Sequence, residues 1–230
     1  MGSCFRNAFE NLGLNIQVSD INSKDKEDHI IENSDWIILT VPINETLKVF
    51  KNIKNKIKKN QIFSDFTSVK SILANDINNC NFEFISCHPL FGPLNNLKGQ
   101  NIVTIPIVSK EKHPLIIEVF EKIGLKITEL KSFKEHDEYM SLIQGMTHFS
   151  HVCFTTAMKK LNPDLDKIME ICSPIYQSNI SFSSRITGGD ENLYTNIIMD
   201  NPLNKEVIEL YLETAKELFE KIKIDDHESF

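Results

Sequence analysis

Up to about residue 131 the chain alternates short apolar segments with helical ones, and beyond that point only helical segments follow. The apolar segments, which we interpret as strands, are residues 15–19, 36–41, 61–65, 82–87, 101–106 and 125–130. The segments of helical periodicity between them are residues 3–13, 27–33, 46–55, 68–75 and 113–123. Strands and helices that alternate at this spacing predict an α/β fold, with a parallel sheet covered by helices on both faces. The run 36–41 is apolar apart from one threonine, which is typical of a strand buried on both faces.

The second half of the chain carries no strand pattern. Its helical segments are residues 132–161, 164–172, 174–185, 190–199 and 203–223. A change from alternating elements to helix alone is typical of a domain boundary. We therefore expect an α/β domain over residues 1–131 and an all-helical domain over residues 132–230.

Composition excludes several classes of protein. The formal net charge of −7 argues against a nucleic-acid partner, because phosphate binding usually needs a basic balance. The five cysteines are odd in number and form no C-x-x-C pair, which favours unpaired thiols in a reducing compartment. No apolar run approaches the length of a membrane span, and the first residues lack a signal-peptide pattern. We therefore expect a cytoplasmic enzyme with no membrane partner.

The start of the chain looks like the end of a dinucleotide-binding motif. Such a motif runs from a strand through G-x-G-x-x-G into a helix, and here Gly2 and Ser3 stand where the last glycine meets that helix. Asp20 follows 18 residues after Gly2, close to the spacing of the acid that binds the ribose 2′-hydroxyl. An acid there favours NAD over NADP. An aspartate in an ordinary turn is an equally good interpretation of Asp20.

The strand that opens such a motif is not found before Gly2. In this fold it lies in the middle of the sheet. Removing about six buried residues, at roughly 1.5–3 kcal/mol each, would cost on the order of 10 kcal/mol. That is comparable to the whole stability of a typical domain, roughly 5–15 kcal/mol. We therefore expect that the native gene product begins upstream of Met1, or that the sequence is a fragment.

Several motifs occur in a fixed order along the chain. They are the runs 34–43, 65–70 (DFTSVK), 88–93 (HPLFGP), 136–140, 144–149 (QGMTHF), 173–176 and 185–194. The ordered set resembles the prephenate dehydrogenases, especially those of the enterobacterial type, and the resemblance extends from Gly2 to the C-terminus. Any one run is moderate evidence, whereas the ordered set is specific.

This resemblance implies a fold and a reaction. The fold is a Rossmann-like NAD-binding domain, here without its first strand, followed by a helical domain that binds substrate and dimerises. The reaction is the oxidative decarboxylation of prephenate by NAD to 4-hydroxyphenylpyruvate, in tyrosine biosynthesis. The resemblance also implies a homodimer and tyrosine as a feedback inhibitor.

The resemblance assigns catalytic roles to two residues of the first domain. His88 ends a predicted strand, at the sheet edge where ligands bind in such folds, and would accept the hydrogen bond of the substrate hydroxyl. Ser68 would bond the same hydroxyl, and it also suits the N-cap of a helix. We expect Lys70, two residues later, to face solvent. The expected cofactor-binding residues are Gly2, Ser3, Asp20, Thr40, Val41, Pro42, Asp65 and Thr67.

Substrate binding is expected from the helical domain. Arg185 matches a family arginine that grips a substrate carboxylate through two parallel hydrogen bonds. His148 matches a family histidine near the substrate that is linked to inhibition by tyrosine. Gln144 and Met140 precede His148 at steps of four, and His136 extends the row, so one helix face would carry all four. Gln144 and Tyr194 are therefore further expected substrate neighbours.

Other interpretations stay open. His148 and His151 could be metal ligands, but no cysteine or carboxylate has a matching spacing, so we expect no metal. An arogenate or cyclohexadienyl dehydrogenase would carry nearly the same motifs, and kinetics with both substrates would distinguish them. A non-catalytic tyrosine-sensing or dimerisation module is a third possibility, which a titration with NAD would test.

Overall fold

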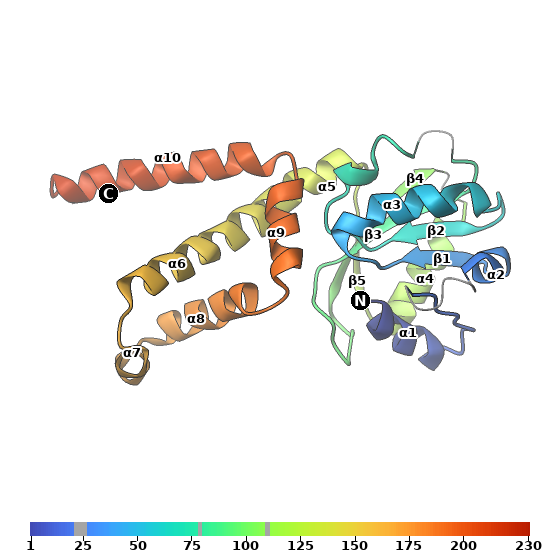
Figure 1. The fold of residues 1–230 in the computed structure, drawn as a ribbon, viewed down its shortest axis with the longest axis horizontal. Coiled ribbons are helices and arrows are strands. Elements are labelled where there is room, and N and C mark those ends of the chain that lie inside the picture. The colour runs from blue at the N-terminus through green and yellow to red at the C-terminus, as the bar shows by residue number, and fades with distance from the viewer. Residues whose placement is uncertain (21–26, 78–79, 109–110) are drawn as a thin grey trace. The chain divides into compact units, whose positions relative to one another are not determined.

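The computed structural model describes residues 1–20, 27–77, 80–108 and 111–230. The chain divides into two compact units, Met1–His136 and Asp137–Phe230, and each is described below by itself (Figure 1). Among the described residues, no helix combines the length and the apolar character that a bilayer crossing requires.

A five-stranded sheet forms the centre of the first unit. Its strands lie side by side in chain order: β1 (Trp36–Leu39), β2 (Ile62–Asp65), β3 (Glu83–Pro89), β4 (Asn101–Val108) and β5 (Lys126–Glu129). All neighbours are parallel except β3 and β4, which are antiparallel and so depart from the expected all-parallel sheet. The reason lies in residues 90–100, which contain no helix. A parallel connection needs a crossover of roughly a dozen residues or more, usually with a helix.

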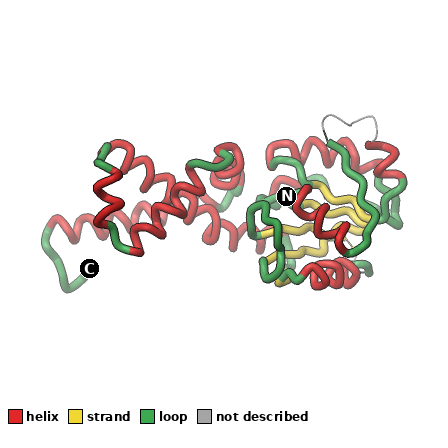
Figure 2. The backbone as a smooth tube through the Cα atoms, turned by 90° about the horizontal axis from the view of Figure 1, so that it is seen from below, coloured by secondary structure: helices red, strands yellow, loops and turns green. Residues whose placement is uncertain are grey.

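Helices cover both faces of this sheet, as predicted (Figure 2). On one face, the core contains Ile31 of α2 (Glu27–Glu32), Phe50 of α3 (Ile43–Ile53) and Phe133 of α5 (Phe133–Met140). On the other face, α1 (Gly2–Asn11) and α4 (His113–Ile123) contribute their buried phenylalanines. The central strands β2, β3 and β4 are thereby buried between two apolar layers.

Three sequence expectations for this unit are wrong. Residues 15–19 form no strand, and Val18 is 54% exposed, because no described strand lies beside β1 for them to pair with. The run 36–41 is only half-buried over most of β1, since β1 is the edge strand of the described sheet. Residues 68–75 form only a short 3-10 turn, η3 (Ser71–Leu73), because the chain turns inward there to bury Val69 and Lys70.

The second unit is entirely helical in its described residues, as predicted. After α5 and a π-helical turn, η4 (Ser141–Met146), come α6 (Thr147–Leu161), α7 (Leu165–Ile171), α8 (Pro174–Thr187), α9 (Glu191–Asp200) and α10 (Asn204–Lys223). The side chains of Asp164, Ser173 and Asp190 accept hydrogen bonds from the first turns of α7, α8 and α9. These caps explain where the three helices begin.

Gly145 in η4 determines how closely this helix approaches α10. A Cβ atom at Gly145 would clash with Oδ1 of Asn204, the first residue of α10. The Asn204 side chain is fixed, because its Nδ2 donates to the carbonyls of Ile197 (2.9 Å) and Ile198 (2.8 Å). The wider π turn also breaks the four-residue spacing, so the expected row of Met140, Gln144 and His148 does not follow one regular α-helical face.

The core of the first unit can be tested in α4, where Ile116 is 2% exposed and its neighbour Leu115 is 55% exposed. We expect Ile116→Ala to lower the free energy of unfolding by about 2–5 kcal/mol, because it leaves a cavity. Leu115→Ala, the matched control, should change it by less than about 0.5 kcal/mol. Trp36, the single tryptophan, packs against Phe120 and reports this unit by fluorescence during urea unfolding. Equal midpoints for the two variants would contradict the assignment.

Candidate active site

The carboxyl ends of β1, β2 and β3 meet at one edge of the sheet. Thr40 follows β1, Thr67 follows β2, and His88 is the penultimate residue of β3. The backbone N–H of Phe66 donates to the carbonyl of Leu39 (3.0 Å), so β1 and β2 stay paired up to this edge. Ligands of open α/β sheets bind outside such an edge. Three of the residues expected from sequence therefore lie where a ligand site would form.

The N-terminus of α1 comes up against Thr40. A Cβ atom at Gly2 would lie 2.7 Å from Thr40 Oγ1, so a larger residue could not stand there without a shift. Side-chain capping is absent at this end of α1, and its first N–H groups carry the positive end of the helix dipole. An anionic group such as a pyrophosphate suits this position.

The remaining expected cofactor residues are less enclosed. Ser3, Asp20 and Pro42 are exposed and Val41 is half-buried. Thr67 differs from them, because its Oγ1 is buried and forms no hydrogen bond in the described structure. An unsatisfied buried hydroxyl costs roughly 1–3 kcal/mol, which a ligand hydrogen bond would remove.

A buried ion pair lies directly beneath this edge. The ammonium group of Lys70 donates to Asp65 Oδ1 (2.7 Å) and to the carbonyl of Cys87 (2.7 Å), and both side chains of the pair are fully buried. Asp65 also accepts from Ser86 Oγ (2.5 Å) and from the N–H of Thr67 (3.1 Å). The expectation that Lys70 faces solvent is therefore wrong. The carboxylate of Asp65, facing inward, provides the partner that makes burial of the lysine possible.

His88 lies beside this pair and is 2% exposed. Its Nδ1 lies 2.9 Å from Nε2 of His136 in α5, with the two rings 5.0 Å apart. Burial, followed by the neighbouring His136 and Lys70, lowers the pKa of His88 well below its ordinary value. The imidazole is therefore neutral near pH 7 and can accept a proton or a hydrogen bond.

Two sequence expectations around His88 need comment. Ser68 is half-buried next to Thr67, and no hydrogen bond joins it to His88 in the described part of the chain. From the sequence, His136 is expected only as part of a row of residues on one helix face, and its contact with His88 is not predicted. The two histidines are 48 residues apart, and no local pattern signals a pairing over that separation.

The second unit brings several expected substrate residues together. The ring of His148 in α6 meets Tyr194 of α9 edge-on, with centroids 5.1 Å apart. Gly189 lies against this tyrosine: a Cβ there would lie 2.8 Å from the carbonyl oxygen of Arg185 and 3.3 Å from the Tyr194 ring. Burial and then the nearby His151 lower the pKa of His148 to about 4, so this ring is also neutral near pH 7.

Polar atoms without partners mark the same region. Nδ1 of His148 and Oε1 of Gln144 are buried and make no hydrogen bond in the described structure. Arg185 near the end of α8 is exposed, and it forms no ion pair with any described residue. Its guanidinium is therefore available to an anion from solution.

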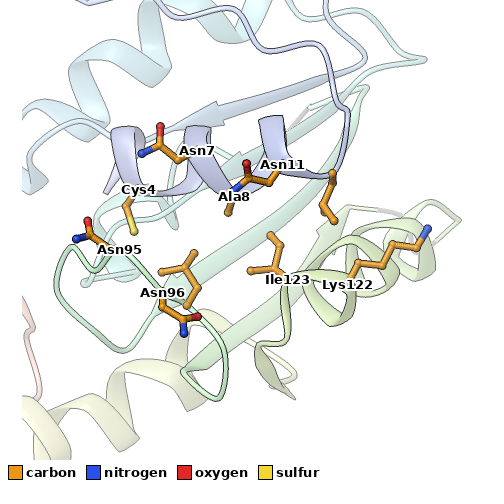
Figure 3. A pocket seen from close by; sticks show the side chains of 10 residues that line it. Cys4, Asn7, Ala8, Asn11, Asn95, Asn96, Lys122 and Ile123 are labelled. Carbon is orange, nitrogen blue, oxygen red and sulfur yellow. The ribbon is translucent and has the colours of Figure 1, made fainter.

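Two hollows in the surface lie apart from these residues. A pocket of about 200 Å³ lies beside α1 and is lined by asparagines, Cys4 and Lys122 (Figure 3). A more apolar pocket of about 420 Å³ in the second unit is lined by α6, α7 and α8, including Met158 and Tyr176. Neither pocket includes a residue that the sequence assigned to catalysis, to the cofactor or to the substrate.

The buried pair predicts a large cost for removing one partner. We expect Lys70→Met to lower the free energy of unfolding by about 3–5 kcal/mol, because Asp65 is left charged and unpaired in the core. Adding Asp65→Asn should restore part of that loss. The control is Lys51→Met, whose pair with Asp76 is half-exposed and should contribute no more than about 1 kcal/mol. A loss for Lys70→Met no larger than that of Lys51→Met, by Trp36 fluorescence in urea, would refute the buried pair.

Comparison with known families accounts for both halves of the chain. Residues 7–128 match the family model for the prephenate dehydrogenase nucleotide-binding domain. Residues 132–230 match the family model for the prephenate dehydrogenase dimerization domain. The order of the two matches is that of the two structural units.

Individual relatives agree with this result. The chain is 30% identical over 232 residues to a probable arogenate/prephenate dehydrogenase of Methanocaldococcus jannaschii, covering 98% of this chain and 50% of that protein. It is 28% identical over 232 residues to the T-protein of Haemophilus influenzae, covering 100% of this chain and 61% of that protein. The chain thus spans about half to three fifths of the length of these curated relatives.

A solved structure shares the fold. The prephenate dehydrogenase of Aquifex aeolicus, in complex with hydroxyphenyl propionate and NAD⁺, superposes with a TM-score of 0.68 at 17% identity, covering 97% of this chain and 79% of that chain. With both family models matched in order over nearly the whole length, the chain belongs to the prephenate dehydrogenase family.

Proposed function

We propose that this protein catalyses the NAD-dependent oxidative decarboxylation of prephenate to 4-hydroxyphenylpyruvate, a step of tyrosine biosynthesis. The observation that carries the proposal is His88, a buried neutral imidazole at the carboxyl edge of β1, β2 and β3. A neutral histidine at a ligand-binding edge suits a base that works near pH 7.

The same edge suits a dinucleotide. Gly2 leaves room for a pyrophosphate at the N-terminus of α1, and Thr67 offers an unsatisfied hydroxyl. Asp20 would hold the ribose 2′-hydroxyl, which favours NAD over NADP. Ser3, Thr40, Val41 and Pro42 complete the proposed cofactor-binding set. Asp65, whose carboxylate faces inward to Lys70 and Ser86, would contribute indirectly, by holding the Thr67 N–H in place. When bound, NAD would supply the hydride acceptor, and the Aquifex structure with NAD⁺ supports this choice.

His88 would handle the proton of the reaction. Hydride leaves the ring carbon that bears the hydroxyl, the bond to the ring carboxylate breaks to release carbon dioxide, and the ring becomes aromatic. As the hydroxyl gains carbonyl character its O–H becomes acidic, and the lone pair of His88 accepts the proton. The proton returns to this oxygen when the ring becomes aromatic, because 4-hydroxyphenylpyruvate keeps the hydroxyl. Ser68 follows β2 in the sequence and is half-buried. We propose that its hydroxyl forms a hydrogen bond with the same substrate hydroxyl.

One carboxylate of the substrate is proposed to bind to the second unit. Arg185 has the planar fork of donors that matches a carboxylate, and no described carboxylate occupies it. The proposed neighbours of the substrate are Gln144, His148 and Tyr194. Gln144 and His148 each have a buried polar atom without a hydrogen-bond partner in the described structure, and Tyr194 packs against His148. We also propose that tyrosine acts as an inhibitor in the region of His148.

A homodimer is part of the proposal. The second unit exposes many large apolar side chains, including Ile175 (83%), Phe182 (60%) and Phe219 (55%). Exposed apolar surface on this scale marks an interface. The match of residues 132–230 to a dimerization domain supports a second copy as the partner.

The alternative is the same reaction on arogenate, which carries an amino group in place of the keto group of prephenate. The name of the Methanocaldococcus relative includes both substrates, and this supports arogenate as an alternative. Steady-state kinetics with the two substrates decide between them by the ratio of kcat/KM.

The role of His88 can be tested directly. We expect His88→Asn to reduce turnover by roughly 10²–10⁴-fold, the usual contribution of a general base, while NAD still binds. His29→Asn is the matched control, because His29 lies exposed on α2. Turnover with prephenate and a fluorescence titration with NAD are the measurements. Near-normal turnover of His88→Asn would remove this residue from the mechanism, and an absence of NAD binding to the unaltered protein would favour a non-catalytic module.

Arg185 gives a separate test of substrate binding. We expect Arg185→Gln to raise KM for prephenate by roughly 10–100-fold, since a charge-assisted pair contributes about 1.5–3 kcal/mol. The chain offers one other arginine as control, Arg6, which is exposed and paired with Glu10. Arg6→Gln should leave KM unchanged. Equal KM values for the two variants would remove Arg185 from the site.

A further inference from the structure

His136 is a fully buried histidine that the proposed reaction does not use. It lies on α5, and its Nε2 is 2.9 Å from Nδ1 of His88. We propose that His136 is a positioning residue: it accepts a hydrogen bond from Nδ1–H of His88, and so leaves the lone pair of His88 on Nε2, free for the substrate hydroxyl. This inference rests on the proposed function, because it assigns the nitrogen that does the accepting.

The argument begins with the chemistry of a neutral imidazole. One ring nitrogen carries a proton and donates, while the other carries a lone pair and accepts. Of the two nitrogens of His88, only Nδ1 has a hydrogen-bond partner in the described structure. If His136 donated to Nδ1, the proton of His88 would lie on Nε2, and that atom could no longer accept the hydroxyl. The proposed base therefore requires His88 to donate and His136 to accept.

The electrostatic surroundings favour a neutral pair of rings, with a single proton in the hydrogen bond between them. Burial and Lys70 disfavour a positive charge on His88, and a charge on both rings would add their mutual repulsion. Both carboxylate oxygens of Asp65 are engaged, Oδ1 by Lys70 and Oδ2 by Ser86. When His88 takes the substrate's proton on Nε2, its Nδ1–H bond to His136 becomes charge-assisted and stronger. His136 thus stabilises the product of proton transfer without receiving the proton.

The start of α5 holds His136 in place. Ser132 Oγ accepts from the N–H of Glu135 (3.1 Å), and Glu135 Oε2 accepts from the N–H of Lys131 (2.6 Å). These reciprocal bonds resemble a capping box, which fixes the first turn of a helix. Phe133 is buried in the core and meets Phe84 of β3 edge-on, with ring centroids 6.2 Å apart. The helix is therefore anchored to the strand that carries His88, and a rigid support of this kind suits a positioning residue.

The test combines a direct observation of the proton with a pair of variants. The full-length protein, labelled with ¹⁵N-histidine, is studied by NMR at pH 7, and the signals of His88 are assigned by their loss in His88→Asn. We expect His88 to carry its proton on Nδ1. In His136→Leu, which removes the acceptor, His88 should lose this single tautomer and kcat should fall by roughly 10–100-fold, while the affinity for NAD and KM for prephenate stay within about twofold.

His136→Gln provides the conservative control, because its side-chain oxygen can stand where Nε2 of His136 stands. It should restore the Nδ1–H tautomer of His88 and most of kcat. A proton on Nε2 of His88 in the unaltered protein would overturn the proposal, as would normal kcat in His136→Leu or failure of a folded His136→Gln to restore the tautomer. The NMR result does not depend on activity, so a protein inactive on prephenate and arogenate would refute the proposed function while the tautomer still decides the role of His136.

Discussion

The buried pair of Asp65 and Lys70 fixes the edge of the sheet on which the candidate site is built. Two charges removed from water are costly, and only full hydrogen bonding offsets that cost. Here the carboxylate receives bonds from Lys70, Ser86 and the Thr67 N–H, and the lysine also bonds the carbonyl of Cys87. The pair therefore joins the end of β2 to the strand position just before His88. A purely apolar core could hold the strands together, but it would not fix the position of one strand end relative to the next along the strand direction.

The same pair influences the chemistry of His88. Burial contributes most to lowering the pKa of His88, followed by His136, and the buried cation of Lys70 acts in the same direction. The base thus remains neutral over the physiological range, although it is a weaker base than an exposed histidine. In the proposed reaction, proton transfer to this weak base would depend on the acidity that the substrate hydroxyl gains as it acquires carbonyl character. Because the base is neutral and shielded from water, solvent does not protonate it before the substrate reacts.

Local patterns predicted much of this molecule, and non-local contacts account for what they missed. The helix His113–Ile123 has the predicted bounds, because Gly124 ends it with a positive φ of 88°. The position of His88 near the end of a strand is likewise confirmed. The burial of Lys70 could not be predicted, since it depends on a carboxylate that faces inward from β2. The close packing of Gly145 on Asn204 joins two helices that are far apart in the sequence, and the pairing of His88 with His136 depends on the docking of α5. Each of these contacts joins residues that no sequence period relates.

The unpartnered atoms of the second unit bear on why one fold serves both prephenate and arogenate. The two substrates differ at one group, a keto oxygen that accepts hydrogen bonds or an ammonium that donates them. A site rejects an analogue strongly only when its buried polar groups are left without a partner. Gln144 can offer either end of its amide, and a neutral His148 can offer either an N–H or a lone pair. In the proposed site, neither residue by itself would penalise one substrate. Discrimination there would come instead from a fixed charge or a rigid backbone group.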